Sequence, residues 1–460
     1  MAELVNRTYA SHFVIDPVAH RAGVATVAVA DGRVASVRWR DGEEAARARW
    51  SAGANPAPGD PADLLLPALV DLHAHFRQPG ARASEEVRSG ALAAAHGGYA
   101  TVALMPNTEP AADNPATVRA MVAGETCGVR LLPIAAATIG RAGGEVVDVA
   151  AVVEAGAVAL SDDGSPIADR AVFRAALLAA ATAGIPLIEH CEDPALTAGG
   201  EAADGVVAAS LGLRPWPATG ETRAVDRAIE VLREVAAETP SVRLHLTHLS
   251  TGAALAAVRA AQREGLPISC DVTPHHLAIT DRWIVGERRW AWECGDADAV
   301  GTPTADAFDA NLRVCPPLRG PADAAACRAA LRDGTALAIG TDHAPHSRER
   351  KEVEFGRAAN GIAGIETSLS VALAAHRAGE LSLATIVAAL TTGPAQLLRC
   401  TLPEIAPGSP ASLVEVDLAA TWRPSRATLF GRSINTPLLG RELPGVVRST
   451  LIEGRLAFPS

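Results

Sequence analysis

The stretch that decides the fold is LLLPALVDLHAH, residues 64–75, which is apolar for most of its length and ends in two histidines. A near-continuous apolar run, without polar alternation, is typical of a strand buried on both faces of a sheet. Further runs of this type follow, separated by longer segments rich in Ala, Arg and Glu. They occupy residues 100–107, 129–136, 157–164, 185–192, 242–248, 266–276 and 336–346.

Strands that alternate with helices eight times predict a closed parallel (β/α)₈ barrel, or TIM barrel, over residues 64–398. An open, doubly wound sheet is the alternative that the pattern leaves open. Most of the apolar runs end in His, Asp or Asn, which favours the barrel. In a barrel the carboxyl ends of all strands meet at one face, where the loops build the active site.

The two ends of the chain show a different pattern, with short alternating strands around hairpin dipeptides. Residues 24–30 and 33–39 flank Asp31-Gly32, and residues 446–452 and 455–458 flank Glu453-Gly454, with another apolar run at 412–418. Neither end has enough strands to bury a sheet face alone. We therefore expect residues 1–63 and 399–460 to form one small β-sandwich, with a linker over residues 51–63 that is rich in Pro, Gly and Ala.

Composition excludes several classes of protein. The chain carries 52 acidic against 41 basic side chains, a net charge of -11, which gives no field that would gather nucleic acid or an anionic membrane. It contains no apolar run long enough to span a bilayer and no secretory signal. Its seven cysteines show no CxxC spacing, which fits a reducing compartment. We expect a cytoplasmic protein with a small-molecule substrate.

Candidate metal ligands stand at the ends of the predicted barrel strands. Side chains at i and i+2 of a strand share one face, so His73 and His75 can ligate the same ion, with Asp71 behind them as an orienting neighbour. Four further candidates end later strands: Asp163, His190, His248 and Asp342. One tetrahedral zinc ion cannot use so many ligands, so the set indicates two ions. Asp163, from the middle of the set, is the candidate for a shared carboxylate. Isolated capping roles remain the alternative reading of each residue.

The strings VDLHAHFRQPG, MPNTEP, ALSDDG, IEHCED, DVTPHHLAITD, TDHAPH and GIAGIETSLS together resemble class I dihydroorotase, a binuclear-zinc group of the amidohydrolase superfamily. The resemblance runs in order through residues 64–400. It implies reversible conversion between (S)-dihydroorotate and N-carbamoyl-L-aspartate in pyrimidine (UMP) biosynthesis. It also implies two Zn²⁺ ions per subunit, bound by His73, His75, Asp163, His190, His248 and Asp342.

The resemblance also implies roles around the substrate. Asp342 is the expected catalytic proton shuttle, and Arg77 and Asn107 are expected to bind the substrate carboxylate, for which a guanidinium offers two parallel hydrogen bonds. The other residues expected at the substrate are His75, Cys315, His346, Asn360 and Gly361, with the backbone amides of the last two facing the pyrimidine ring.

The lysine content bears on which branch of the superfamily this is. The relatives that hydrolyse hydantoins, dihydropyrimidines and allantoin bridge their metals with a carboxylated lysine from the fourth strand. Lys351, in the loop after the eighth strand, is the only lysine of this chain. A carboxylate must therefore take the bridging position, and this argues against the hydantoinase and allantoinase branches.

Two departures from the family pattern leave alternatives open. The family has Asn before the PPLR string, where this chain has Cys315, and a thiol cannot copy the paired donor and acceptor of an amide. Residues 283–311 form a long connection with three tryptophans, for which a lid, an oligomer contact and a segment anchored to the barrel are the alternatives. The alternatives are a related cyclic-amide hydrolase with another acidic substrate, and a silent scaffold for aspartate transcarbamoylase. Homo-oligomer formation and binding to a transcarbamoylase stay open.

Overall fold

A computed structural model of the chain describes residues 3–295 and 299–458. Its centre is an eight-stranded parallel sheet with the strand order β14-β13-β12-β9-β8-β7-β6-β5. The strands are β5 (Leu69–Ala74), β6 (Tyr99–Leu104), β7 (Arg130–Ala135), β8 (Ala159–Ser161), β9 (Leu187–His190), β12 (Leu244–Thr247), β13 (Ile268–Val272) and β14 (Ala336–Ile339). Just beyond β14, the His75 amide donates to the His343 carbonyl oxygen at 2.9 Å and closes the ring, so the predicted TIM barrel is confirmed.

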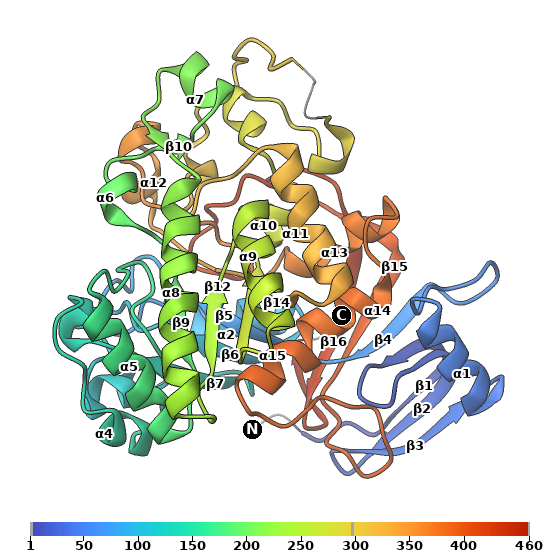
Figure 1. The fold of residues 1–460 in the computed structure, drawn as a ribbon. Coiled ribbons are helices and arrows are strands. Elements are labelled where there is room, and N and C mark those ends of the chain that lie inside the picture. The colour runs from blue at the N-terminus through green and yellow to red at the C-terminus, as the bar shows by residue number, and fades with distance from the viewer. Residues whose placement is uncertain (1–2, 296–298, 459–460) are drawn as a thin grey trace.

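Helices cover the outside of this barrel (Figure 1). They are α2 (Val87–His96), α3 (Pro115–Met121), α4 (Val149–Glu154), α5 (Arg170–Ala183), α8 (Thr219–Glu238), α9 (Gly252–Arg263), α11 (Pro321–Asp333), α13 (Ser368–Arg377), α14 (Leu383–Leu390) and α15 (Thr392–Leu397). Every residue of β5 is buried, which fits its mostly apolar sequence; Asp71 and His73 are its polar members. The helices instead bury one apolar stripe each, such as Val225, Ile229 and Leu232 of α8.

Shorter elements lie in the connections between the barrel strands and their outer helices. They are α6 (Pro194–Thr197), α7 (Val206–Leu211), α10 (Pro274–Ala278), α12 (Arg348–Lys351), and the two-residue strands β10 (Ala202–Ala203) and β11 (Pro215–Trp216). Several of these connections, together with the yellow segment near residue 300, gather at the top of the molecule in Figure 1. Among the described residues, no helix has the length and apolar character needed to cross a membrane.

Strands from both ends of the chain form a second, seven-stranded sheet with the order β17-β16-β15-β4-β1-β2-β3. Its members are β1 (Arg7–Asp16), β2 (Arg21–Ala30), β3 (Arg33–Trp39), β4 (Asp63–Pro67), β15 (Leu413–Trp422), β16 (Leu443–Ile452) and β17 (Arg455–Phe458). Both predicted hairpins are present, and their turns meet, since a Cβ atom added at Gly454 would lie 2.3 Å from Cα of Gly32. The Val5 amide donates to the Gly454 carbonyl oxygen at 2.8 Å, and Arg33 pairs with Pro410.

Two local features differ from the sequence prediction. Residues 64–67, which we expected in the first barrel strand, form β4, which pairs with β1 and β15 of the terminal sheet before the chain turns into β5. Residues Gly42–Ser51, expected as part of a strand-and-turn region, form helix α1. Glu43 and Glu44 lie in its first turn and Arg49 in its last, an arrangement that suits the helix dipole.

Candidate active site

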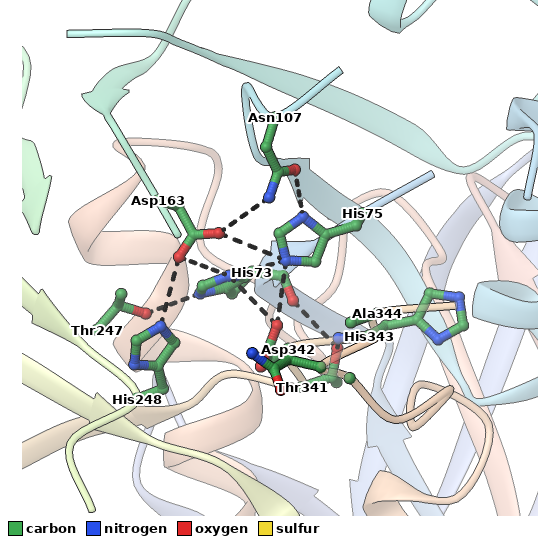
Figure 2. Close-up of polar contacts among 12 residues, drawn as sticks. His73, His75, Asn107, Asp163, Thr247, His248, Thr341, Asp342, His343 and Ala344 are labelled. Carbon is green, nitrogen blue, oxygen red and sulfur yellow. Dashed lines mark hydrogen bonds and ion pairs between the residues drawn. The ribbon is translucent and has the colours of Figure 1, made fainter. Parts of the chain in front are cut away.

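Six side chains predicted as metal ligands come together at the carboxyl end of the barrel. His73 lies in β5, His190 ends β9, and the others follow β5, β8, β12 and β14 within a few residues. None is more than 8% exposed, although all six are polar. In Figure 2, dashed lines join Asp163 to His75 on one side and to His248 on the other. The members are His73, His75, Asp163, His190, His248 and Asp342.

The ligand atoms form two triads that share Asp163. In the first triad, the Nε2 atoms of His73 and His75 are 3.2 Å apart and lie 3.6 and 3.7 Å from the Asp163 carboxylate. In the second, Nδ1 of His190 and Nε2 of His248 are 3.0 Å apart and lie 3.6 and 3.4 Å from Oδ1 of Asp163. Within each triad the ligand atoms lie within 4.8 Å of one another. A carboxylate shared by two histidine pairs is the arrangement that a bridging ligand requires.

The hydrogen bonds on the outer side of each ring show that these residues fit a cation. Oδ1 of Asn107, which can only accept, lies 2.7 Å from Nδ1 of His75, so that nitrogen carries the proton and Nε2 keeps a lone pair. The Glu192 carboxylate lies 3.0 Å from Nε2 of His190, so this nitrogen can donate to Glu192 while Nδ1 of the same ring faces Asp163. When such a ring is neutral, a proton held on its outward nitrogen leaves a lone pair on the inward nitrogen, and this suits a positive ion beside Asp163.

The charges of the cluster lead to the same conclusion. Burial alone would lower the pKa of His73, but the carboxylates of Asp163 and Asp342 outweigh it and raise that pKa to about 9. Burial would raise the pKa of Asp163, yet the surrounding His73 and His190 hold it well below its usual range. The two acids are thus ionised, and the site attracts positive charge.

A ring of buried aspartates fixes the strand ends that carry the ligands. Asp71 accepts the Thr341 amide at 3.0 Å, beside Asp342, and Asp271 accepts the His248 amide at 3.0 Å. Asp162 accepts the amides of the residues that follow β7. His248 and Asp342 both have a φ of 42°, a left-handed backbone that costs energy in a residue other than glycine. Asp71 also accepts the His73 amide at 3.3 Å, so it orients both strand ends through the backbone.

Asp342 lies between the metal-ligand cluster and the open cavity. Its Oδ1 is 3.1 Å from Nε2 of His75 and 3.5 Å from Nε2 of His73. Burial would raise its pKa, but the adjacent rings of His75 and His73 lower it. An ionised carboxylate that borders the cavity can accept a proton from a molecule bound there.

The cluster forms the floor of a cavity of about 610 Å³, the size of a small-molecule site. The residues predicted to contact substrate all line it: His75, Arg77, Asn107, Cys315, His346, Asn360 and Gly361. Arg141, Arg313 and Arg350, which were not predicted, line it as well. The lining thus combines four arginines with five carboxylates, those of Glu109, Asp163, Glu192, Glu201 and Asp342, and the arginines can pair with an anionic group of a ligand.

The Arg77 side chain is hydrogen-bonded to the backbone of the cavity wall and carries a positive charge. Its Nε donates to the Pro345 carbonyl oxygen at 3.3 Å, and its backbone has a φ of 55°. Burial lowers its pKa to about 10, so it is positive at neutral pH. Among the described residues no carboxylate forms an ion pair with Arg77. A partly buried guanidinium at a cavity wall, without a carboxylate partner among the described residues, is suited to a ligand carboxylate.

Asn107 and Gly361 are arranged differently from the prediction. The side-chain oxygen of Asn107 is bound to His75, and its Nδ2 donates to Oδ2 of Asp163 at 3.3 Å, so the amide holds two metal ligands rather than standing free for a substrate carboxylate. The Gly361 amide, expected to face the substrate ring, donates to the Arg313 carbonyl oxygen at 2.8 Å. His346 also has an internal partner, because its Nε2 lies 2.7 Å from the Asn360 carbonyl oxygen.

Cys315 lies beside Glu192, a residue that the sequence analysis did not single out. The Cys315 thiol is 3.5 Å from Oε2 of Glu192 and 3.9 Å from Nε2 of His190. Glu192 also accepts a hydrogen bond from the Thr197 hydroxyl. The i, i+2 spacing of His190 and Glu192 is the same signal that indicated His73 and His75, and it could have identified the carboxylate as a partner of the imidazole.

Lys351 does not reach the metal-ligand cluster. Its Nζ donates to the carbonyl oxygens of Ala359 and Gly361 at 2.8 and 3.1 Å. Asp163 lies between the two histidine pairs.

The long connection over residues 283–311 is anchored to the protein. The Trp283 indole is fully buried and donates to the Arg289 carbonyl oxygen, and Trp290 stacks against Trp292 with ring centroids 5.3 Å apart. The Arg441 guanidinium covers Trp290 at 3.9 Å from the ring centroid. None of the described residues of this connection lines the cavity, which favours the anchor over the lid; residues 296–298 lie outside the described part.

A barrel that carries clustered histidines and aspartates at its carboxyl face is the architecture of a metal-dependent hydrolase. The chain matches the family model described as "Amidohydrolase family" over residues 218–457 and the model described as "Dihydro-orotase-like" over residues 62–252. The class of this protein is therefore the amidohydrolase family.

Curated relatives narrow the assignment. A dihydroorotase of Anaeromyxobacter dehalogenans is 40% identical over 96% of this chain and 95% of its own length. A dihydroorotase of Pelotomaculum thermopropionicum is 36% identical over 97% of this chain and 96% of its own length. The chain belongs to the dihydroorotase family.

Solved structures confirm the fold. The L-hydantoinase (dihydropyrimidinase) of Arthrobacter aurescens superimposes with a TM-score of 0.77 at 20% identity, over 99% of this chain and 96% of that one. The dihydropyrimidinase of Brevibacillus agri gives a TM-score of 0.74 at 19% identity, over 99% and 95%. At this level of identity the likeness concerns the barrel and its accompanying sheet, and not the substrate.

Proposed function

We propose that this chain catalyses the reversible hydrolysis of (S)-dihydroorotate to N-carbamoyl-L-aspartate. The reverse reaction, cyclisation of N-carbamoyl-L-aspartate, is the ring-forming step of pyrimidine synthesis. The observation that carries the proposal is Asp163, which two histidine pairs share in a chain closely related to dihydroorotases. The position of this carboxylate between the pairs suits a bridging ligand, and the only lysine is engaged elsewhere.

The donor set suits two Zn²⁺ ions. His73, His75 and Asp163 would hold one ion, His190, His248 and Asp163 the other, with Asp342 as a further ligand beside the first pair. Imidazole and carboxylate ligands at this number favour zinc, although they also accommodate other divalent ions. When bound, such ions supply Lewis acidity and acidify water near neutral pH.

The protein's own residues then move the proton. In hydrolysis, water adds to the ring carbonyl carbon next to nitrogen, and the carbon–nitrogen bond breaks. Asp342 accepts the proton of the water and returns it to the leaving ring nitrogen. In the cyclisation direction one proton is consumed as the carboxylate becomes a ring amide and water leaves, so lower pH favours dihydroorotate.

Arg77 accounts for the preference for an acidic ring. Dihydroorotate carries a carboxylate, which dihydrouracil and hydantoin lack. The guanidinium of Arg77 is charged, partly buried and without a carboxylate partner among the described residues, so it can form a bidentate pair with that group. A neutral ring would leave this cation unpaired, and binding would be weakened.

Two measurements test the proposal: the metal content of the purified chain, and its turnover of dihydroorotate against dihydrouracil, hydantoin and allantoin. Two metal ions per chain with dihydroorotate preferred is the expected result. Two metal ions with preference for another ring would reject the substrate assignment. A chain without metal and without turnover would agree instead with a scaffold for aspartate transcarbamoylase.

A second candidate is a related hydrolase of another acidic cyclic amide, and Cys315 is the observation that favours it. The thiol lines the cavity where the family has an asparagine. Cys315→Asn should change kcat/KM for dihydroorotate by about 2–10-fold, the effect of one hydrogen bond. A loss with the restored asparagine, together with stronger turnover of a different acidic ring by the natural chain, would support this candidate. Cytoplasmic location, homo-oligomer formation and a transcarbamoylase partner stay predictions.

A further inference from the structure

The connection between β15 and β16, residues 423–442, leaves the terminal sheet and reaches the substrate side of the barrel rim. We infer that Asn435 in this connection is a positioning residue, which holds the cavity wall that contains His346 and Gly361. The terminal segment thereby completes the substrate site of the barrel. The role in substrate binding rests on the proposed function, whereas the hold on the wall does not.

Asn435 uses its whole side chain for this contact. Its Oδ1 accepts the His346 amide at 2.9 Å, and its Nδ2 donates to the carbonyl oxygens of Ala344 and Gly361 at 3.1 and 3.0 Å. The residue is only 5% exposed. Both amide protons and the oxygen are engaged with two separate loop segments, so one side chain sets the distance between them.

The two segments form one wall of the cavity. The Ala344 amide donates to the Ile362 carbonyl oxygen at 2.8 Å, and the Ala363 amide donates to the backbone oxygen of Asn435 at 3.0 Å. Gly361 has a φ of 141°, and a Cβ atom there would lie 2.5 Å from that of Ala344. The wall is therefore tightly packed, and a shift of either segment moves His346 and Gly361 relative to Arg77.

The connection is itself fastened to the barrel before it reaches Asn435. The Glu366 carboxylate accepts the amides of Phe430 and Gly431 at 2.9 and 3.0 Å. Glu85, which is fully buried, accepts the Arg432 amide at 3.1 Å. These anchors restrict the residues on the N-terminal side of Asn435, so the asparagine is presented to the wall in a defined position.

Two substitutions separate loss of the side chain from reversal of its chemistry. Asn435→Ala removes the three side-chain hydrogen bonds. Asn435→Asp keeps the shape and the acceptor for His346, but it replaces both donors by a negative oxygen that faces the carbonyl oxygens of Ala344 and Gly361. Thr450→Val is the matched control. It removes a buried 2.7 Å hydrogen bond from β16 to the Ala95 carbonyl oxygen of α2, away from the cavity wall.

The first experiment compares metal content, kcat and KM of the full-length variants. We expect both Asn435 variants to bind as much metal as the natural chain. We expect KM for dihydroorotate to rise about tenfold or more, with a smaller change in kcat, because the wall binds substrate and the strand ends hold the metal ligands. Thr450→Val should keep the natural KM. An unchanged KM in both Asn435 variants, or an equal rise in the control, would overturn the inference.

The second experiment tests the route through His346. Because Asn435 acts through this residue, the KM effects of Asn435→Ala and His346→Ala should not multiply in the double variant. Hydrogen exchange adds a readout without substrate: the peptide containing the His346 amide should exchange about tenfold faster in Asn435→Ala, but not in Thr450→Val. If the natural chain fails to turn over dihydroorotate, the proposed function falls, while unchanged exchange at His346 would reject the positioning role by itself.

Discussion

The two walls of the cavity are built differently. One wall, called the metal-ligand wall below, is the cluster of six candidate ligands that was described as the cavity floor. Its side chains lie on or shortly after barrel strands, and buried aspartates such as Asp71 and Asp271 fix their backbone. The other wall, called the substrate wall below, consists of loop residues that include Arg77, His346 and Gly361. Hydrogen bonds from distant segments hold its parts together, as Asn435 does for His346. The first wall is set by the barrel, whereas the second depends on contacts between loops and the terminal connection. The barrel thus supplies the general chemistry, and the loops select the molecule.

The strongest test of the metal-ligand wall is Asp163→Ala. Since both histidine pairs share this carboxylate, its removal should abolish stable metal binding and lower kcat/KM by about 10³-fold or more. Metal analysis and steady-state kinetics on the purified variant measure both effects. The control is Asp169→Ala, which removes the N-cap of α5 and should cost stability without loss of metal. A metal-loaded, active Asp163→Ala enzyme would contradict the shared-ligand assignment.

The corresponding test of the substrate wall is Arg77→Ala. Loss of a charge-assisted pair should raise KM for dihydroorotate by about 10–100-fold and reduce turnover, with the metal content unchanged. Arg77→Lys keeps the charge but not the paired donors, so it should recover only part of the loss. If the alanine variant had natural kinetics, the carboxylate would be bound elsewhere, with Arg141 and Arg313 as the next candidates.

The same contrast explains what could be predicted from the sequence. His73, His75 and the other strand-end ligands were predictable because a strand fixes the direction of alternate side chains, and parallel strands end at one face. The partners of Asn107 and Gly361 were not, because each depends on a segment far away in the chain: Asp163 for Asn107, and Arg313 for Gly361. Asn435 lies 89 residues from His346 and carries no local signal of the contact.

A smaller effect on metal binding is expected from substitution of residues that hydrogen-bond a metal ligand from outside the cluster, such as Glu192. Glu192→Gln keeps an acceptor for Nε2 of His190 but removes the charge that orients and polarises the ring. Metal affinity should fall about tenfold, measured by competition with a chelator. Glu234→Gln, on the exposed face of α8 and paired with Arg170, is the control and should leave metal affinity unchanged. Equal affinity in both variants would limit the outer layer to a packing role.

The smallest effect should come from Lys351, whose Nζ donates to the Ala359 and Gly361 carbonyl oxygens of the substrate wall. Its substitution should change the free energy of unfolding more than the catalytic rate. Burial lowers its pKa to about 7, the nearby Asp309 opposes this shift, and Arg313 adds to it. Between pH 7 and the ordinary lysine value the native state is neutral at this group while the unfolded chain is protonated. The unfolded chain then binds more protons, so stability rises with pH across this window.

Lys351→Met isolates that contribution. The natural chain should gain about 1–2 kcal/mol of unfolding free energy from pH 7 to pH 9 relative to the variant, measured by urea denaturation of the metal-loaded enzyme at both pH values. Below pH 7 the unfolding free energies of the natural chain and of the variant should change with pH in the same way. Lys351 is then protonated in both the native and the unfolded state of the natural chain. If the two unfolding free energies change in the same way up to pH 9, Nζ stays charged while it donates to the Ala359 and Gly361 carbonyl oxygens. In that case the substrate wall would contain a fixed cation in its support, and the loop would be held by charge-assisted rather than neutral hydrogen bonds.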